Sequence, residues 1–218
     1  MLIKLKYNTV SPLLIDLLQK LMIAEEFQKF NLVGGTNLSL QLGHRMSVDI
    51  DLFSDAKYGT IDFRAIDDYL KRNFEYVDNF EFELIGFGKT YYVGHSKDNC
   101  IKLDLFYTDT FIRPFHLIEN IRLASLEDIS AMKLEVISNS GRKKDFWDIH
   151  ELLSLFSLEE MIGFYIERYP YGYSREEIIK KATDFKLADD DFNPICLRGK
   201  YWEIIKLDLI EEVEKLSL

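Results

Sequence analysis

The sequence predicts an α+β fold in which a mixed sheet with helices, over residues 1–120, precedes a helical portion over residues 121–218. Two observations support this prediction. Short segments of alternating polarity are frequent in the first part, whereas apolar residues at helical spacing dominate the second. At 218 residues the chain is long enough for one substantial core, or for a catalytic domain with a helical extension.

The composition is that of a globular protein, with 47% hydrophobic and 29% charged residues and few Pro and Gly. No apolar run approaches the roughly 18–20 residues that span a bilayer, so no membrane partner is expected. The N-terminus lacks the apolar core and cleavage site of a signal peptide. Cys100 and Cys196 form no CxxC pair, so a zinc site or a disulfide framework is not expected. These features favour a cytoplasmic protein.

The net charge of −10 restricts the partners that the chain can bind. Neutralising phosphates supplies much of the affinity for RNA or DNA, and an acidic surface opposes it. Generic coating of nucleic acid is therefore not expected, although a local basic patch could still bind it. A basic protein partner would be favoured by electrostatic steering.

The first helix is expected to start at Ser11 and Pro12, because Pro is preset for the first helical turn. Apolar residues then recur at helical spacing and form one stripe: Leu13, Leu14, Leu17, Leu18, Leu21 and Met22.

The segment from Leu32 to Phe53 is the most informative part of the chain. It combines a short apolar strand, paired glycines, a short helix, a polar loop and a second strand that carries Asp49 and Asp51. Alternate residues of a strand face the same side, so the two carboxylates project together, about 6.6 Å apart. Such carboxylates repel each other unless a cation lies between them, and Mg²⁺ prefers oxygen ligands that it shares with substrate phosphates.

The glycines predict the other half of this site. Gly34 and Gly35 let the backbone approach a ligand closely, and a helix starting near Thr36 would direct free N–H groups at an anion. A phosphate site beside metal-binding aspartates indicates chemistry on a nucleoside triphosphate. The alternative for the aspartates is a charge pattern that protects an edge strand, but this does not explain the glycines. Thr36 and Ser47 could each hydrogen-bond phosphate or cap their own turns.

Residues 61–74 have the pattern of a second amphipathic helix. Three strands are expected next, over Glu81–Phe87, Thr90–His95 and Cys100–Tyr107, with Gly88-Lys89 as a tight turn between the first two. In the third strand Lys102, Asp104 and Phe106 share one face. Asp104 is a candidate third carboxylate, which could bind a metal or accept a proton; otherwise it is an exposed residue on a half-buried strand.

Beyond Arg113-Pro114 the sequence is expected to be helical. Ser125 fits a capping box, and a break is expected over residues 139–141. Further helices are predicted over residues 144–156, after a cap at Ser174, and over residues 201–216. The acidic run at 189–191 has the composition of a solvated spacer, with a second metal site as the weaker alternative.

The spacing of Gly34-Gly35, thirteen residues and Asp49-x-Asp51 resembles the first motif of the DNA polymerase β-type nucleotidyltransferase superfamily. The filling, with Gly43-His44-Arg45-x-Ser47 before the Asp-Ile-Asp-Leu-Phe strand, is similar to one branch, the AbiEii/AbiGii toxin family of type IV toxin–antitoxin and abortive-infection systems. Later stretches, Ala-Met-Lys-Leu at 131–134 and Lys-Lys-Asp-Phe-Trp-Asp-Ile at 143–149, also resemble motifs of that family.

The resemblance implies a polymerase β-type core and roles for single residues. Two Mg²⁺ ions would be held by Asp49, Asp51 and Asp104. Phosphates would lie against Gly34, Gly35, Thr36 and Ser47, with positive charge from Lys133, Arg142 and Lys144. Lys133 could instead be an ordinary helix charge. Asp145 and Asp148 would position the basic residues, or they could complement the helix dipole.

The resemblance further implies transfer of a nucleoside monophosphate from a nucleoside triphosphate to RNA, plausibly to the 3′ end of tRNA, by a toxin that a cognate antitoxin controls. Three alternatives stay open at this point. The acceptor could be a protein side chain, the chain could bind nucleotide without catalysis, or it could modify a cationic antibiotic.

Overall fold

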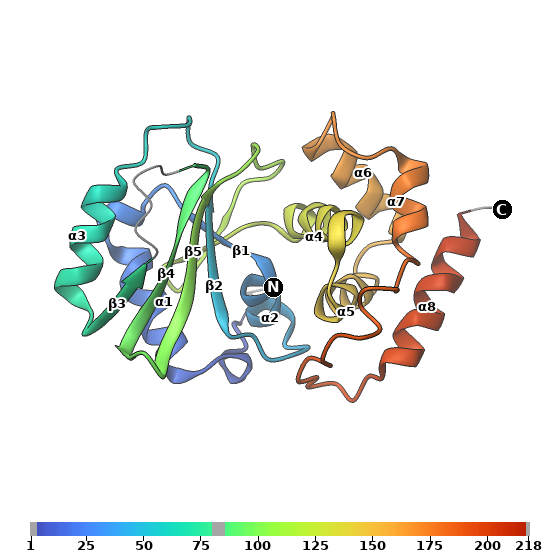
Figure 1. Ribbon diagram of the computed structural model, residues 1–218. Helices are drawn as coiled ribbons and strands as arrows, with labels where there is room; N and C mark the ends of the chain where they lie inside the picture. The colour runs from blue at the N-terminus through green and yellow to red at the C-terminus, as the bar shows by residue number, and fades with distance from the viewer. Residues whose placement is uncertain (1–3, 80–85, 217–218) are drawn as a thin grey trace. The chain divides into compact units, whose positions relative to one another are not determined.

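The structure is a computed structural model that describes residues 4–79 and 86–216. In this part of the chain it has a mixed sheet and helices, as the α+β prediction requires (Figure 1). The strands are β1 (Asn31–Val33), β2 (Asp49–Ser54), β3 (Tyr76–Asn79), β4 (Gly88–Ser96), β5 (Asn99–Tyr107), β6 (His116–Ile118) and β7 (Ile121–Leu123). The α-helices are α1 (Pro12–Ile23), α2 (Gly34–Leu42), α3 (Phe63–Asn73), α4 (Leu126–Ser140), α5 (Lys143–Leu152), α6 (Leu158–Arg168), α7 (Arg175–Lys181) and α8 (Trp202–Lys215).

The seven strands form one sheet in the order β3-β4-β5-β2-β1-β7-β6. Its centre is the parallel pair β2 and β5, with β4 antiparallel to β5 and β1 antiparallel to β2. β1 also pairs in parallel with β7. The strand with the Asp-Ile-Asp motif therefore lies inside the sheet and not at its edge, which removes the edge-protection alternative for its charges.

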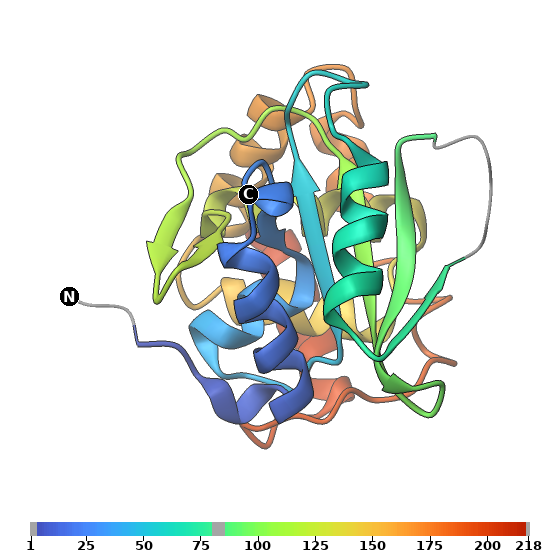
Figure 2. The same ribbon diagram turned by 90° about the vertical axis from the view of Figure 1, so that its left-hand side faces the viewer.

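The two faces of this sheet differ. Figures 1 and 2 show α1 and α3 together on one face, while α2 lies on the other. Strand residues that face α1 and α3 are fully buried and belong to the main core, among them Ile50, Leu52, Leu103 and Leu105. The alternate residues of β2 and β5, which include the aspartates, therefore project from the face that α1 and α3 leave uncovered.

The first helix forms as the sequence predicts. The Ser11 hydroxyl accepts a hydrogen bond from the Leu14 N–H, and Pro12 occupies the first turn. The predicted helix over residues 61–74 is α3, which begins one residue after Asp62 because the carboxylate of Asp62 caps its first N–H groups.

The predicted turn at Gly88-Lys89 is wrong. Both residues lie inside β4, where Gly88 pairs with Phe106 of β5. A Cβ at Gly88 would lie only 2.6 Å from Cδ1 of Phe106, so this glycine serves close packing in a strand. Most of the predicted strand Glu81–Phe87 lies outside the described residues, while β3 was not predicted.

The chain does not become helical directly after Pro114. β6 and β7 come first, joined by Glu119 and Asn120, which both have positive φ. Two consecutive residues of this kind are typical of the tight hairpin turns whose twist matches that of the strands. The sequence Glu-Asn lacks the glycine that usually marks such turns, which explains why this hairpin escaped prediction.

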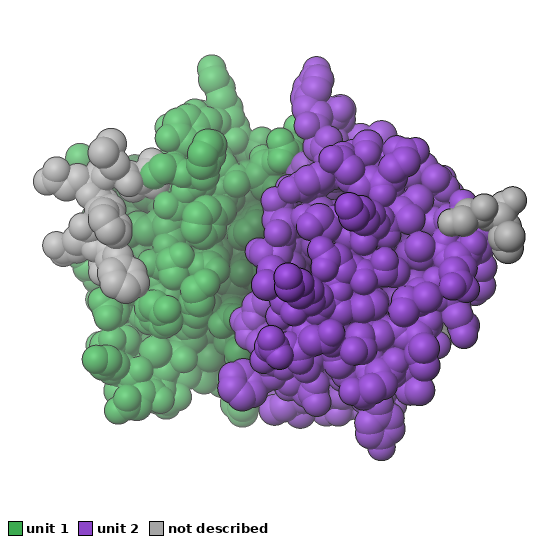
Figure 3. Space-filling model, turned by 45° about the vertical axis from the view of Figure 1, so that its right-hand side comes forward, with its two compact units in different colours: residues 1–42, 47–110, 114–124 green, residues 43–46, 111–113, 125–218 purple. Residues whose placement is uncertain are grey.

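The contacts divide the chain into two compact units (Figure 3). Unit 1 comprises residues 1–42, 47–110 and 114–124 and carries the sheet with α1, α2 and α3. Unit 2 comprises residues 43–46, 111–113 and 125–218 and is helical. The division into a catalytic core over residues 1–120 and a helical region over residues 121–218 stays a prediction.

In unit 2, α4, α6 and α7 begin at side-chain caps. Ser125, Ser157 and Ser174 each accept a hydrogen bond from a backbone N–H of the first turn, at the starts of α4, α6 and α7. Among the described helices, none combines the length and the apolar character that crossing a membrane requires.

Candidate active site

Three predicted site residues come together on one face of the β2–β5 pair. In the parallel register Asp51 lies opposite Asp104, and Asp49 lies opposite Lys102. All four side chains point away from the core, because their neighbours along each strand, such as Ile50 and Leu103, are fully buried. The two strands thus place three carboxylates and one ammonium on a single half-exposed face.

Gly34 brings the start of α2 against this face. It has φ of +68°, a conformation that favours glycine, and it follows Val33, which pairs with Asp51. A Cβ at Gly34 would collide with the Asp51 carboxylate. The absence of a side chain therefore lets the Asp51 carboxylate approach the first turn of α2, where backbone N–H groups favour an anion.

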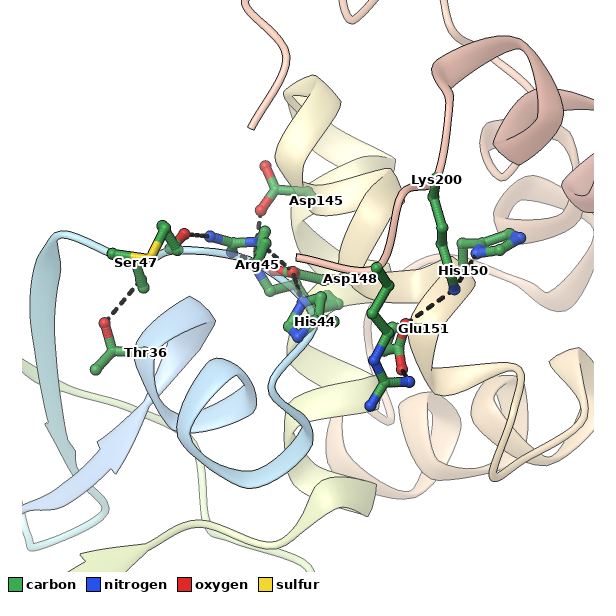
Figure 4. A network of polar contacts seen from close by, with 12 residues as sticks. Thr36, His44, Arg45, Ser47, Asp145, Asp148, His150, Glu151 and Lys200 are labelled. Atoms are coloured by element: carbon green, nitrogen blue, oxygen red, sulfur yellow. Dashed lines mark hydrogen bonds and ion pairs between the residues drawn. The ribbon is translucent and has the colours of Figure 1, made fainter. Parts of the chain in front are cut away.

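Thr36 and Ser47 are buried and connect α2 to the loop before β2. The Thr36 hydroxyl donates to the carbonyl of Asp49 and lies 2.8 Å from the Ser47 hydroxyl (Figure 4). These contacts fix the backbone at the first aspartate of the motif. Phosphate contacts for Thr36, Ser47 and Gly35 stay predictions.

The Asp104 carboxylate has two side-chain partners, one on the neighbouring strand β4 and one on its own strand β5. The Thr90 hydroxyl of β4 donates to one oxygen at 2.6 Å, and the Lys102 ammonium contacts the other at 2.5 Å. Burial lowers the pKa of Lys102, but the hydrogen bond and charge of Asp104 and the charges of Asp49 and Asp51 outweigh burial and raise this pKa above its usual value. Lys102 is therefore charged and neutralises part of the acidic face.

These residues fit a divalent cation that the substrate helps to hold. Within residues 4–79 and 86–216, no three His, Cys, Asp or Glu side chains form a ready metal-binding cluster. Mg²⁺ does not need one, because it commonly takes one or two protein carboxylates and completes its shell with water and substrate phosphates. Asp49 and Asp51, beside the first turn of α2, would supply the carboxylates for that arrangement.

Replacing Lys102 by methionine should strengthen the binding of divalent cations. The ammonium competes with the metal for the acidic face, and methionine keeps the length of the side chain without its charge. Since this ion pair is partly exposed, we expect Mn²⁺ to bind about two- to fivefold more tightly. Electron paramagnetic resonance titration with Mn²⁺ measures this change, and Lys97→Met, in the exposed turn between β4 and β5, is the control. Equal or weaker Mn²⁺ binding by Lys102→Met would contradict the competition.

Lys133, the predicted fourth catalytic residue, lies in unit 2 and is only 6% exposed. Its ammonium on α4 contacts Asp145 and Asp148 of α5, each at 2.7 Å. The expected pairing of these two aspartates with basic residues is therefore present. A direct role of Lys133 in catalysis stays a prediction.

Arg45 completes this buried group of charges. Its guanidinium contacts both oxygens of Asp148, at 2.6 and 2.8 Å, and His44 Nε2 lies 2.8 Å from the same carboxylate (Figure 4). The two positive charges of Arg45 and Lys133 balance the two negative charges of Asp145 and Asp148. Most arginines lie at the surface, whereas this pair of Arg45 and Asp148 is buried.

The segment with His44 and Arg45 is also held through its backbone. Arg45 forms an isolated β-bridge with Cys196, the Met46 N–H donates to the carbonyl of Ile195, and the Leu197 N–H donates to that of His44. Residues 43–46, which come directly before the Asp-Ile-Asp strand, are therefore fixed within unit 2 by side chains and backbone alike.

The buried charges control each other's protonation. Burial raises the pKa of Asp148, but the charges of Arg45 and Lys133 and the hydrogen bonds of His44 and Arg45 outweigh burial and hold this pKa well below its usual value of 3.8. Burial lowers the pKa of Lys133, and Asp145 and Asp148 raise it above its usual value of 10.5. Asp148 and Lys133 are therefore both charged at neutral pH.

This arrangement predicts a specific acid sensitivity. A carboxyl group with a lowered pKa in the folded state contributes stability above its unfolded pKa and loses it as the pH falls through the folded pKa. Between about pH 7 and pH 5, the difference in free energy of unfolding between the native chain and Asp148→Asn should stay constant. It should shrink below about pH 4. Urea unfolding at each pH measures this difference, and the exposed Glu159→Gln supplies the comparison. A difference that is as large at pH 3 as at pH 5 would contradict the prediction.

The remaining predicted phosphate ligands lie at the start of α5 in unit 2. Arg142 is exposed and contacts Asp191 at 3.1 Å, while Lys144 is half-buried and is the second residue of the helix. The structure also identifies three residues that the sequence did not assign to the site: Thr90, Lys102 and Gly88. Of these three, only Lys102 is indicated by the sequence, because alternation along the strand places it on the same face as Asp104.

A family model described as "Nucleotidyl transferase AbiEii toxin, Type IV TA system" matches residues 16–193. A relative is the uncharacterized protein of Aquifex aeolicus (strain VF5), 26% identical over 194 residues, which cover 85% of this chain and 79% of that protein.

Solved structures share the fold. A Helicobacter pylori protein described as a candidate nucleotidyltransferase matches with a TM-score of 0.57 and 18% identity, covering 94% of this chain and 91% of that one. MenT4, a nucleotidyltransferase toxin of Mycobacterium tuberculosis H37Rv, matches with a TM-score of 0.56 and 13% identity, covering 92% and 83% of the two chains.

Proposed function

The chain belongs to the AbiEii nucleotidyltransferase toxin family, and from that membership we propose that it transfers a nucleoside monophosphate from a nucleoside triphosphate to the 3′ end of RNA. The enzyme class follows from the family: the chain is a nucleotidyltransferase. The nucleotide, the acceptor and the metal are parts of the proposal.

The observation that carries the proposal is the meeting of the Asp51 carboxylate, Gly34 and the strand-paired Asp104. Phosphoryl transfer requires positioning and charge stabilisation more than covalent chemistry by the protein. Gly34 and the first turn of α2 would bind the triphosphate, and Gly35 and Thr36 shape that turn. Asp49 and Asp51 would hold Mg²⁺, which offsets phosphate charge and lowers the pKa of the attacking hydroxyl.

Asp104 has a distinct role in this proposal. It lies across from Asp51, and Thr90 holds one of its oxygens. A carboxylate fixed in this place can orient the attacking hydroxyl and accept its proton. Lys102 would then move from Asp104 to the phosphate oxygens when substrate binds, and so keep the charge of the site balanced.

We propose RNA as the acceptor, with the 3′ end of tRNA as the site of transfer. We propose an antitoxin as the protein partner. The type IV toxin–antitoxin description of the family supports the antitoxin. The isolated cysteines and the need for nucleoside triphosphate fit action in the cytoplasm. The net charge of −10 favours the second candidate, transfer to a protein side chain, over extensive contact with nucleic acid.

Incubation with each α-³²P nucleoside triphosphate, Mg²⁺, total bacterial RNA and cell extract tests the proposal. We expect one nucleotide to label RNA, and the label to disappear in the Asp49→Ala, Asp51→Ala double variant. Label on protein that disappears in the same variant would replace RNA by a protein acceptor. Triphosphate binding without label on either would contradict both acceptors.

A further inference from the structure

The carboxylate row continues into a pair of aromatic rings. Two residues beyond Asp51 and Asp104, about 6.6 Å along each strand, the register places Phe53 opposite Phe106. Both side chains project on the same face as the carboxylates, because strand residues alternate. Their ring centroids are 5.9 Å apart at an interplanar angle of 66°.

The rings of Phe53 and Phe106 do not pack into the hydrophobic core of unit 1. Their neighbours Leu52 and Leu105 are fully buried and belong to the core, whereas Phe53 and Phe106 are half-exposed and lie outside that cluster. A face that otherwise carries charged groups thus ends in two partly exposed aromatic rings. Such a combination is typical of sites that bind a flat, polar molecule.

The sheet gives Phe106 the room that this requires. Gly88 lies opposite it on β4, and a Cβ there would come within 2.6 Å of the ring. Two residues further along the same strand, Thr90 fixes Asp104. β4 therefore shapes both the carboxylate and the ring beside it.

The order along the sheet shows which part of the reaction lies beside the rings. β1 is antiparallel to β2, so Val33 pairs with Asp51 and leads directly to Gly34 and α2, whereas Asn31 pairs with Phe53. The pair of Asp51 and Asp104 thus lies between Gly34, where the triphosphate would bind, and the rings. In-line displacement places the attacking hydroxyl opposite the departing pyrophosphate, so the rings lie on the acceptor side.

We propose that Phe53 and Phe106 form a stacking platform for the terminal base of an unpaired 3′ nucleotide of the acceptor. The inference rests on the proposed function, which it extends by assigning the acceptor a base at the attacking end. Proteins bind single-stranded RNA ends by stacking bases on aromatic rings, and this contact tolerates any base. A side-chain hydroxyl of a protein acceptor has no use for such a platform.

The test compares two short probes of unpaired RNA in equilibrium binding. Both are seven-nucleotide single strands with a 5′ fluorescein; one ends in adenosine and the other in an abasic ribose. With Ca²⁺ in place of Mg²⁺ to prevent transfer, we expect the native chain to bind the adenosine probe about ten- to a hundredfold more tightly, as anisotropy reports.

The double variant Phe53→Leu, Phe106→Leu keeps apolar bulk without the flat rings and should lose this preference, while its affinity for nucleoside triphosphate stays unchanged. Phe53→Tyr should retain it. Phe115→Ala, at an exposed phenylalanine beside β6 near the far edge of the sheet, is the matched control. Urea unfolding verifies that each variant is folded, and Phe53→Leu alone replaces the double variant if that one is not.

Equal binding of the two probes by the native chain, or a preference that survives the leucine variants, would overturn the platform. These outcomes are separate from failure of the proposed function. If the platform is wrong, the Asp-dependent label on RNA still supports the proposed function. Label on protein alone would instead remove RNA as the acceptor, whatever the binding assay gives.

Discussion

Replacing Asp51 by asparagine is expected to lower the rate of nucleotidyl transfer by about a thousandfold or more while the fold stays intact. The side chain is half-exposed, so the isosteric amide costs little stability. It removes the charge that lies against the start of α2 and across from Asp104, where the substrate's phosphates and their cation would need it. The kcat for transfer of labelled nucleotide measures this loss.

Asp98→Asn is the matched control for this prediction. Asp98 lies in the exposed turn between β4 and β5, the same hairpin that carries Asp104, and its variant should retain full activity. Asp104→Asn should also lose activity, since its carboxylate faces Asp51. A variant at Asp51 that keeps more than a tenth of the native rate would exclude this carboxylate from the reaction.

Replacing Asp148 by alanine is expected to lower the free energy of unfolding by about 3–5 kcal/mol. The carboxylate is fully buried and is the shared partner of Arg45 and Lys133. Its removal leaves two buried cations with only Asp145 to compensate them. Denaturant unfolding, with the midpoint and the slope reported separately, measures the effect.

Glu159→Ala provides the contrast. Glu159 pairs with Arg175 at 2.7 Å in the same unit, but both side chains are substantially exposed. An exposed pair of this kind contributes at most about 1 kcal/mol. Similar losses for the two variants would show that the buried group is no more important to stability than a surface ion pair.

Much of the candidate active site could be predicted from the sequence because one local rule, alternation along a strand, governs it. Alternation along a strand places Asp49 and Asp51 together, and it also places Lys102, Asp104 and Phe106 together. The order of the strands in the sheet cannot be predicted from a local pattern, because strand pairing joins segments that lie far apart in the chain. Only the structure reveals that Asp51 faces Asp104 and that Asp49 faces Lys102.

The errors share a physical cause. Glycine usually marks a turn, but Gly88 lies in a strand, where it leaves room for the backbone of Leu105 and the ring of Phe106 on the neighbouring strand. Most arginines lie at the surface, but Asp148, more than a hundred residues away, neutralises Arg45 in the interior. Both cases depend on a distant partner that no local pattern encodes.

The four residues from Gly43 to Met46 interrupt unit 1 in the middle of the motif, between the glycines and the aspartates. A gene cut after residue 124 would therefore not yield a minimal enzyme: His44 and Arg45 would remain in the fragment without the α5 carboxylate that they contact. For the same reason, recombination that exchanges the helical part between relatives must preserve an acidic residue at position 148. Sheet and helices are thus constrained to be inherited together.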